Sequence, residues 1–291
     1  MRTLVAAALI LVLGGFTSAP AADNKITLVA AENFYGGVAV EIGGDQVSVT
    51  SILSNPDQDP HLFETSPTIV RKIAMAQIVV YNGVGYDPWM TNALSVTPNP
   101  ARVVLVVANL MHKSAGDNPH LWYDPATMPA VARALAAALS EADPVHQKGY
   151  AKRLNAFLAS LEPLNEKVAA IGNKYAGVPV TATEPVFGDM AAALKLKMRN
   201  ERFQLSIMND TEPRARDLAA FEQDLALHRV RVMFYNKQAS NEIVQHLVAY
   251  ARASNIPVVG VTETAPPGLS YRDWMLSELA ETEKALAQSS S

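Results

Sequence analysis

The chain has 291 residues, 49% of them hydrophobic, so it is long enough to build one large or two modest folded domains. Its 24 basic and 28 acidic residues give a formal net charge of −4, which argues against nucleic acid or an anionic membrane as a partner. The sequence contains no cysteine, which excludes disulfides and thiolate metal sites, so any bound metal must be held by nitrogen and oxygen.

Residues 1–22 have the pattern of a secretory signal peptide. Arg2 provides a positive charge, residues 4–14 form a short apolar stretch, and the small residues at 18–22 form a cleavage region. The apolar stretch is shorter than the roughly 18 residues of a membrane span, and no cysteine follows it. We therefore expect an exported protein that is cleaved near Ala21 or Ala22 and carries no lipid anchor.

In the next part of the chain, short apolar runs rich in β-branched residues alternate with helical patterns. Continuous apolar runs of this length are typical of strands buried on both faces of a parallel sheet. They predict strands at 26–31, 47–53, 78–82 and 103–108, with helices at 66–75 and 129–142. This alternation indicates α/β units.

Residues 143–175 carry the periodicity of one long amphipathic helix. Apolar residues recur there at spacings of three and four, which place them on one helical face. Asp143 is suited to cap the helix and Pro144 fits its first turn, whereas Pro163 is expected to kink it. This segment separates the first group of predicted strands from a second one.

The second group repeats the α/β pattern, with strands expected at 179–183, 203–207, 231–235 and 257–262 and helices at 213–227 and 241–253. The fold class that follows is α/β, with two lobes joined by one long backbone helix. Each lobe should contain a four-stranded, mainly parallel sheet flanked by helices. The expected organisation is a signal peptide at 1–22, an N-terminal lobe at 23–142, a linking helix at 143–176 and a C-terminal lobe at 177–291.

Four residues able to bind a divalent metal follow predicted strands. They come after the second, fourth, fifth and eighth strands and are His61, His120, Glu184 and Glu263. Ligands of open α/β sheets bind beyond the carboxyl ends of the strands, so two facing lobes could bring all four into one cleft. Imidazole and carboxylate ligands suit zinc, manganese and iron. Each residue taken singly is as readily an ordinary loop residue, so the residues alone leave both interpretations open.

The chain resembles the metal-binding solute receptors of zinc and manganese ABC importers. The similarity runs through nearly all of the mature chain and includes DPHLFETSP, YNGVGYDPWM, DNPHLWYDP and the closing SYRDWMLSELAETEKAL. It implies two lobes bridged by a rigid helix, with His61 and His120 as ligands from the N-terminal lobe. Glu184 stands where zinc receptors commonly have a third histidine, and Glu263 stands in the place of the usual final aspartate.

The resemblance implies a periplasmic, monomeric receptor that captures one zinc or manganese ion, or alternatively iron(II), and delivers it to an ABC permease. No enzymatic activity is expected. One rival is a metal-dependent hydrolase that uses the same ligands around an open coordination position, although the sequence has no HExxH pair. Another rival is a receptor for an organic solute, with a larger pocket lined by Trp89, Trp122 and Tyr271.

Overall fold

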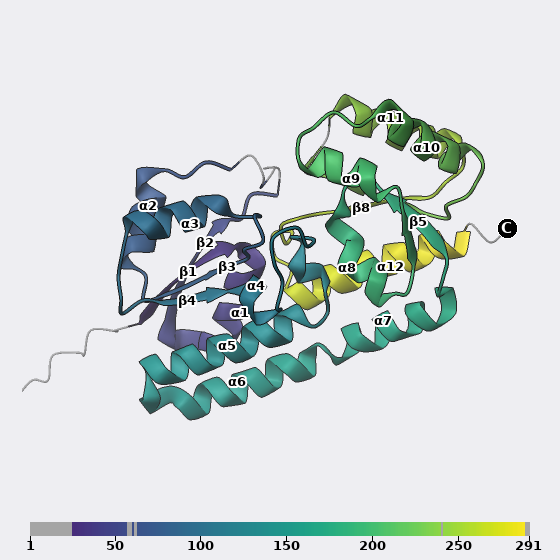
Figure 1. Ribbon diagram of the computed structural model, residues 1–291. Coiled ribbons are helices and arrows are strands. Elements are labelled where there is room, and N and C mark those ends of the chain that lie inside the picture. The colour runs from purple at the N-terminus through teal and green to yellow at the C-terminus, as the bar shows by residue number, and fades with distance from the viewer. Residues whose placement is uncertain (1–24, 57–59, 61–62, 240, 289–291) are drawn as a thin grey trace, which may run out of the picture.

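The computed structural model describes residues 25–56, 60, 63–239 and 241–288, so the predicted signal peptide lies outside the described residues. Two four-stranded sheets are present, with strand orders β2-β1-β3-β4 and β6-β5-β7-β8. Every pairing between neighbouring strands is parallel. We call the halves built on these sheets the N-lobe and the C-lobe (Figure 1). The predicted fold class is confirmed.

The N-lobe sheet is covered by helices on both faces. Successive residues of its first strand point to opposite sides, because side chains alternate along a strand. Leu28 and Ala30 pack with the first and fifth helices, whereas Val29 and Ala31 pack with the second and third. The elements are β1 (Ile26–Glu32), α1 (Asn33–Gly43), β2 (Val47–Leu53), α2 (Pro67–Met75), β3 (Ile78–Tyr81), α3 (Pro88–Val96), β4 (Val103–Val106), α4 (Val107–Leu110) and α5 (Thr127–Ala142).

The linking helix consists of two consecutive segments, α6 (Gln147–Ser160) and α7 (Glu162–Tyr175), which run along both lobes (Figure 1). Only Leu161 lies between them. Pro163 stands in the first turn of α7, where its missing N–H removes no helical hydrogen bond. The long connection predicted for this segment is therefore present, and its interruption coincides with the proline.

The C-lobe repeats the arrangement of the N-lobe. Met233 packs with the helices on one face of the sheet, α9 to α11, and Phe234 faces the side that holds α7 and α12. The elements are β5 (Pro179–Ala182), α8 (Gly188–Ala193), β6 (Lys197–Arg199), α9 (Glu201–Met208), α10 (Ala215–Ala226), β7 (Met233–Asn236), α11 (Glu242–Ala253), β8 (Val258–Val261) and α12 (Tyr271–Gln288).

One predicted strand is wrong. Residues 203–207 belong to helix α9, and the strand at this place in the sheet is β6, at residues 197–199. Phe203 and Ile207 are buried while Leu205 is 47% exposed. A spacing of four residues puts Phe203 and Ile207 on one helical face, and the exposure of Leu205 fits a helix, not an alternating strand.

The two lobes share one hydrophobic core. Its aromatic rings meet across the lobe boundary, with Tyr123 and Phe187 centred 5.5 Å apart and Phe34 and Trp274 centred 5.8 Å apart. Such contacts limit how far one lobe can rotate against the other. In the part of the chain that is described, no helix is both long and apolar enough to cross a membrane.

Candidate metal centre

Three of the four predicted ligands lie among the described residues, and His61 lies outside them. His120, Glu184 and Glu263 are almost completely buried, with exposures of 0%, 4% and 0%. The Nε2 atom of His120 lies 3.5 Å from Oε2 of Glu263, so the two lobes meet through these side chains. Over residues 25–56, 60, 63–239 and 241–288, no three His, Asp or Glu side chains form a metal-binding group by themselves.

The spacing between His120 and Glu263 agrees with two ligands of one metal ion. Zinc binds nitrogen and oxygen at about 2.1 Å, so two ligands at a tetrahedral angle lie about 3.4 Å apart. The observed separation of 3.5 Å is close to this value and longer than an ordinary hydrogen bond. Both side chains are buried, so an ion between them would be shielded from water.

The two C-lobe carboxylates are positioned by adjacent strands. Glu184 follows β5 and Glu263 follows β8, while Asn236 ends β7, which lies between those two strands in the sheet. The Nδ2 atom of Asn236 donates to Oε2 of Glu184 at 2.6 Å and to Oε1 of Glu263 at 2.5 Å. One buried amide therefore binds both predicted ligands of this lobe.

Gln238 fixes the backbone beside Glu263. Its Oε1 atom accepts hydrogen bonds from the N–H groups of Glu263 at 2.6 Å and Thr264 at 3.2 Å. Its Nε2 atom donates to the Thr264 hydroxyl at 3.1 Å. The segment that follows β8 is thus held by a side chain from the loop after β7, which restricts the positions open to the Glu263 carboxylate.

Asn118 determines which nitrogen of His120 can bind a metal. The Oδ1 atom of Asn118 is 2.8 Å from Nδ1 of His120, and the Nδ2 atom donates to the Pro185 carbonyl at 2.9 Å. Because Asn118 uses its N–H group toward that carbonyl, its oxygen faces the imidazole, and Nδ1 must carry the hydrogen. The lone pair then lies on Nε2, the atom that faces Glu263.

The N-lobe contains a pair of buried acidic groups, Glu32 and Asp87. Burial raises the pKa of Glu32 well above its usual range, and the nearby Asp87 raises it further. Burial also raises the pKa of Asp87 to about 6, although the backbone N–H groups of Gly83 and Asn82 donate to its carboxylate and oppose this rise. Of the two carboxyls, Glu32 is therefore the one whose protonated form burial and the neighbouring acid favour more strongly.

A further buried carboxyl supports the strand end next to Glu263. Burial raises the pKa of Glu278 to about 7, while hydrogen bonds from Tyr123 and Trp274 act in the opposite direction. Glu278 accepts from the Tyr123 hydroxyl at 2.8 Å and from the indole of Trp274 at 2.9 Å. The same tyrosine hydroxyl lies 2.8 Å from the carbonyl of Thr262, so an N-lobe residue contacts the segment that carries Glu263.

The sequence interpretation missed the asparagines and glutamine that hold the predicted ligands. Each has a weak signal in the sequence. Asn118 stands two residues before His120, Asn236 is the last residue of the seventh strand, and Gln238 stands two residues beyond it. Side-chain amides are common in loops, and only the paired carboxylate contacts in the structure distinguish Asn236 from an ordinary turn residue.

The three aromatic residues considered for an organic-solute site are packed in the interior. Trp122 is 0% exposed, Tyr271 is 5% exposed and Trp89 is 7% exposed. The Tyr271 hydroxyl donates to the Trp122 carbonyl at 2.8 Å, and the Trp89 ring packs against Phe63 at 4.8 Å. Little of their surface is available to a ligand, which argues against a large organic solute.

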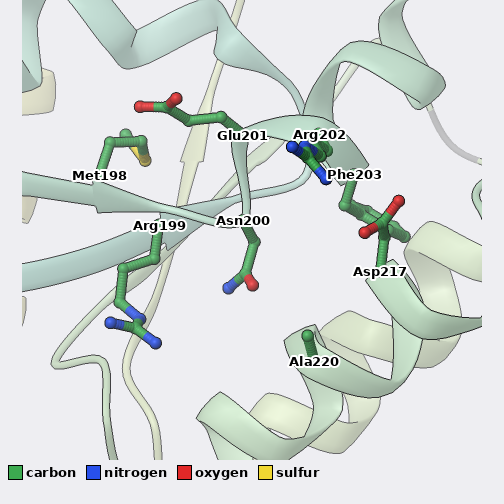
Figure 2. Close-up of a pocket in the computed structure, with 8 residues that line it drawn as sticks. All are labelled: Met198, Arg199, Asn200, Glu201, Arg202, Phe203, Asp217 and Ala220. Atoms are coloured by element: carbon green, nitrogen blue, oxygen red, sulfur yellow. The ribbon is translucent and has the colours of Figure 1, made fainter.

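The C-lobe also contains a pocket of about 420 Å³, between the end of β6 and helix α10 (Figure 2). Arg199 and Asn200 point toward α10, and the Arg199 guanidinium pairs with Asp224 of that helix at 2.7 Å. Neither Glu184 nor Glu263 lines this pocket. It therefore adds no ligand to the candidate metal centre.

Comparisons with known proteins show the family of this chain. Residues 28–285 match the family described as zinc-uptake complex component A, periplasmic. A putative metal-binding protein of Treponema pallidum is 25% identical over 277 residues, covering 87% of this chain and 84% of that protein. The manganese ABC transporter substrate-binding lipoprotein scaA of Streptococcus gordonii is 21% identical, covering 94% of this chain and 92% of that protein.

The fold also matches solved structures. The periplasmic zinc binding protein TroA from Treponema pallidum superposes with a TM-score of 0.77 at 17% sequence identity, covering 90% of this chain and 99% of that one. The resemblance to metal receptors of ABC importers is confirmed by the family match. Because that match spans nearly the whole described chain, this protein belongs to the zinc-uptake complex component A family.

Proposed function

We propose that this protein is a periplasmic receptor that binds one divalent transition metal ion between its lobes and delivers it to an ABC permease. The observation that carries the proposal is the meeting of His120 and Glu263, which come from different lobes. Both are fully buried, and their facing atoms are 3.5 Å apart. A buried imidazole and carboxylate at this separation are suited to sharing a metal ion.

The full ligand set in this proposal is His61, His120, Glu184 and Glu263. Two neutral imidazoles and two carboxylates would balance the charge of a divalent ion, so that the buried complex carries little net charge. A site in which every ligand comes from the protein, with no exchangeable water, suits a receptor, because a receptor holds the ion and does not use it in a reaction. Protonation of the imidazoles at low pH would release the ion.

Contacts between the lobes support limited movement around the bound ion. The side-chain amide of Asn33 donates to the Ala265 carbonyl at 2.8 Å and accepts from the Ala265 N–H at 3.0 Å. The Asn118 amide contacts Pro185 across the same boundary. Together with the shared aromatic core, these bonds favour adjustment of the ligand loops over a large swing of the lobes.

Zinc and manganese are both candidates for the cargo, and iron(II) is a third. The carboxylates suit manganese and iron, whereas an equal number of imidazoles also suits zinc. Among relatives, one protein of Streptococcus gordonii is named for manganese and one of Streptococcus pyogenes for iron. A hydrolase built on the same residues is the rival function, and it would require one ligand position to be open to water.

Metal titration of the purified, metal-stripped protein tests the proposal. We expect one ion per chain and an increase in unfolding free energy of about 2.7 kcal/mol at a free metal concentration one hundred times Kd. His120→Ala should abolish this stabilisation, whereas His246→Ala should preserve it, because His246 is an exposed residue of α11 that bonds Glu222. Unchanged stability with zinc, manganese and iron(II) would reject a metal receptor. Metal-dependent ester or phosphate hydrolysis would favour the rival.

A further inference from the structure

Asn236 occupies a central position among the predicted C-lobe ligands. It is the last residue of β7 and is 1% exposed. Because β7 lies between β5 and β8, its side chain reaches both the carboxylate after β5 and the carboxylate after β8. The amide nitrogen has two hydrogens and gives one to Glu184 and one to Glu263.

The orientation of this amide is determined by its other contact. The Oδ1 atom of Asn236 accepts the N–H of Gln238 at 3.0 Å. An N–H group cannot accept that bond, so the oxygen must face Gln238 and the nitrogen must face the carboxylates. The Asn236 N–H also donates to the Thr183 hydroxyl at 3.3 Å, which fixes the backbone. Both hydrogens of the amide are therefore directed at the two glutamates.

These bonds distinguish the two oxygens of each carboxylate. Asn236 binds Oε2 of Glu184 and Oε1 of Glu263. The other oxygen of Glu263, Oε2, is the atom that faces His120. Each carboxylate oxygen has two lone pairs. The bond from Asn236 occupies one lone pair of Oε2 of Glu184 and of Oε1 of Glu263 and draws negative charge from these oxygens, so the other oxygen of each carboxylate is the better metal ligand.

We propose that Asn236 is a positioning and specificity-determining residue that favours metal binding through a single oxygen of Glu184 and a single oxygen of Glu263. Two such oxygens and two imidazoles make a four-coordinate site. Zinc is stable in that geometry, whereas manganese prefers six ligands, many of them oxygens. Asn236 thus favours zinc over manganese. This inference rests on the proposed function, because it assumes that the site holds a metal.

The test compares Asn236→Leu with the wild-type protein and with Asn82→Leu. Leucine has a similar size to asparagine but no hydrogen to donate, so it releases both carboxylates. Asn82 is a buried asparagine that follows the corresponding strand of the N-lobe, and its amide bonds the Pro119 carbonyl rather than a predicted ligand. Zinc and manganese dissociation constants are measured on metal-stripped protein by competition with a chelator.

We expect Asn236→Leu to reduce the preference for zinc over manganese by at least about tenfold, the order of effect seen for residues that orient metal ligands. Asn82→Leu should change both affinities by the same factor. Cobalt(II) gives a second readout, since four-coordinate cobalt absorbs visible light far more strongly than six-coordinate cobalt. The wild-type protein should give the strong spectrum, and Asn236→Leu a weaker one.

An unchanged metal preference in Asn236→Leu would overturn the inference. So would a weak, six-coordinate cobalt spectrum of the wild-type protein, and that measurement remains decisive if the leucine variant does not fold. Wild-type protein that binds neither zinc nor manganese would instead reject the proposed function, and this inference with it. The two failures are therefore distinguishable.

Discussion

The two lobes present their predicted ligands in different ways. In the C-lobe, Glu184 and Glu263 each stand two residues beyond the end of a strand, so the sheet itself determines where they lie. In the N-lobe, His120 comes well after the end of β4, beyond helix α4 and a loop. Its imidazole is oriented by Asn118. We infer from this difference in support that the C-lobe provides the rigid half of the site and the N-lobe the adjustable half.

Equivalent positions in the two sheets have acquired different chemistry. In the N-lobe sheet, Ala30 of β1 pairs with strand β3. In the C-lobe sheet, Ala182 of β5 pairs with strand β7, which occupies the same place in the strand order. Two residues further on stand Glu32 in the N-lobe and Glu184 in the C-lobe. Glu32 lies against Asp87 and has a raised pKa, whereas Glu184 is bonded by Asn236. The same scaffold position thus holds an acid with a raised pKa in one lobe and a candidate ligand in the other.

The largest effect is expected from the ligands themselves. Glu263→Gln keeps the size of the side chain but removes its charge, and we expect zinc affinity to fall by more than about 100-fold, beyond the loss caused by changing residues that only orient a ligand. Glu184→Gln should have a comparable effect, because both carboxylates belong to the rigid half. Competition titration measures both. A normal affinity in Glu263→Gln would remove this residue from the site.

Glu278→Gln tests the support of the rigid half through its pH dependence. The folded-state pKa of Glu278 is about 7, above its ordinary 4.5, so the folded protein holds a proton that the unfolded chain has lost between these values. Wild-type stability therefore falls as pH rises from about 4.5 to above 7. Glutamine carries no charge. Its oxygen can accept from Trp274 and its amide nitrogen can donate to the Tyr123 hydroxyl, which then donates to the Thr262 carbonyl, so the variant should avoid this loss.

The gain should reach roughly 3 kcal/mol at pH 8 for metal-free protein and vanish near pH 4, at about 1.4 kcal/mol per unit of pKa. Thermal and denaturant unfolding at a series of pH values measures it. A variant that is less stable than wild type at pH 8 would mean that the carboxylate form of Glu278 is required in the folded protein.

Asn118→Ala tests the adjustable half. Loss of the acceptor that orients His120 should lower metal affinity by about 10- to 100-fold. Asn118→Asp provides the matched control, because it keeps an acceptor for Nδ1 of His120 but cannot donate to the Pro185 carbonyl. We expect the aspartate variant to bind metal more tightly than the alanine variant. Equal affinities would show that the bond to Pro185, rather than imidazole orientation, is the function of Asn118.

The smallest effect is expected at the contact between the halves. Asn33→Ala removes two hydrogen bonds to the Ala265 backbone, and we expect a loss of about 1–2 kcal/mol in unfolding free energy. Metal affinity should change by less than about tenfold, because the Asn33 side chain bonds the Ala265 backbone and not His120, Glu184 or Glu263, the ligands among the described residues. Asn33→Asp retains the acceptor and should lose less stability. A larger effect on affinity than on stability would mean that lobe closure depends on this contact.

Much of the fold follows from the sequence, because buried parallel strands appear as short apolar runs separated by helical periodicity. Seven of the eight predicted strands overlap observed ones. The exception is at residues 203–207, because the four-residue spacing of Phe203 and Ile207 fits both the two-residue period of a strand and the 3.6-residue period of a helix. In the second half of the chain, Glu184 and Glu263 are both buried, and their role as metal ligands stays a prediction. The amides of Asn236 and Asn118 could not be assigned from the sequence, since their function depends on which strands and loops become neighbours.

Diffraction from zinc-loaded crystals at the zinc absorption edge tests the central claim most directly, because the anomalous signal locates the ion. We predict a single ion between the lobes, about 2.1 Å from Nε2 of His120 and from Oε2 of Glu263. His61 and one oxygen of Glu184 should complete its coordination. An ion bound by one lobe alone, or one that leaves Glu263 more than about 3 Å away, would contradict the account.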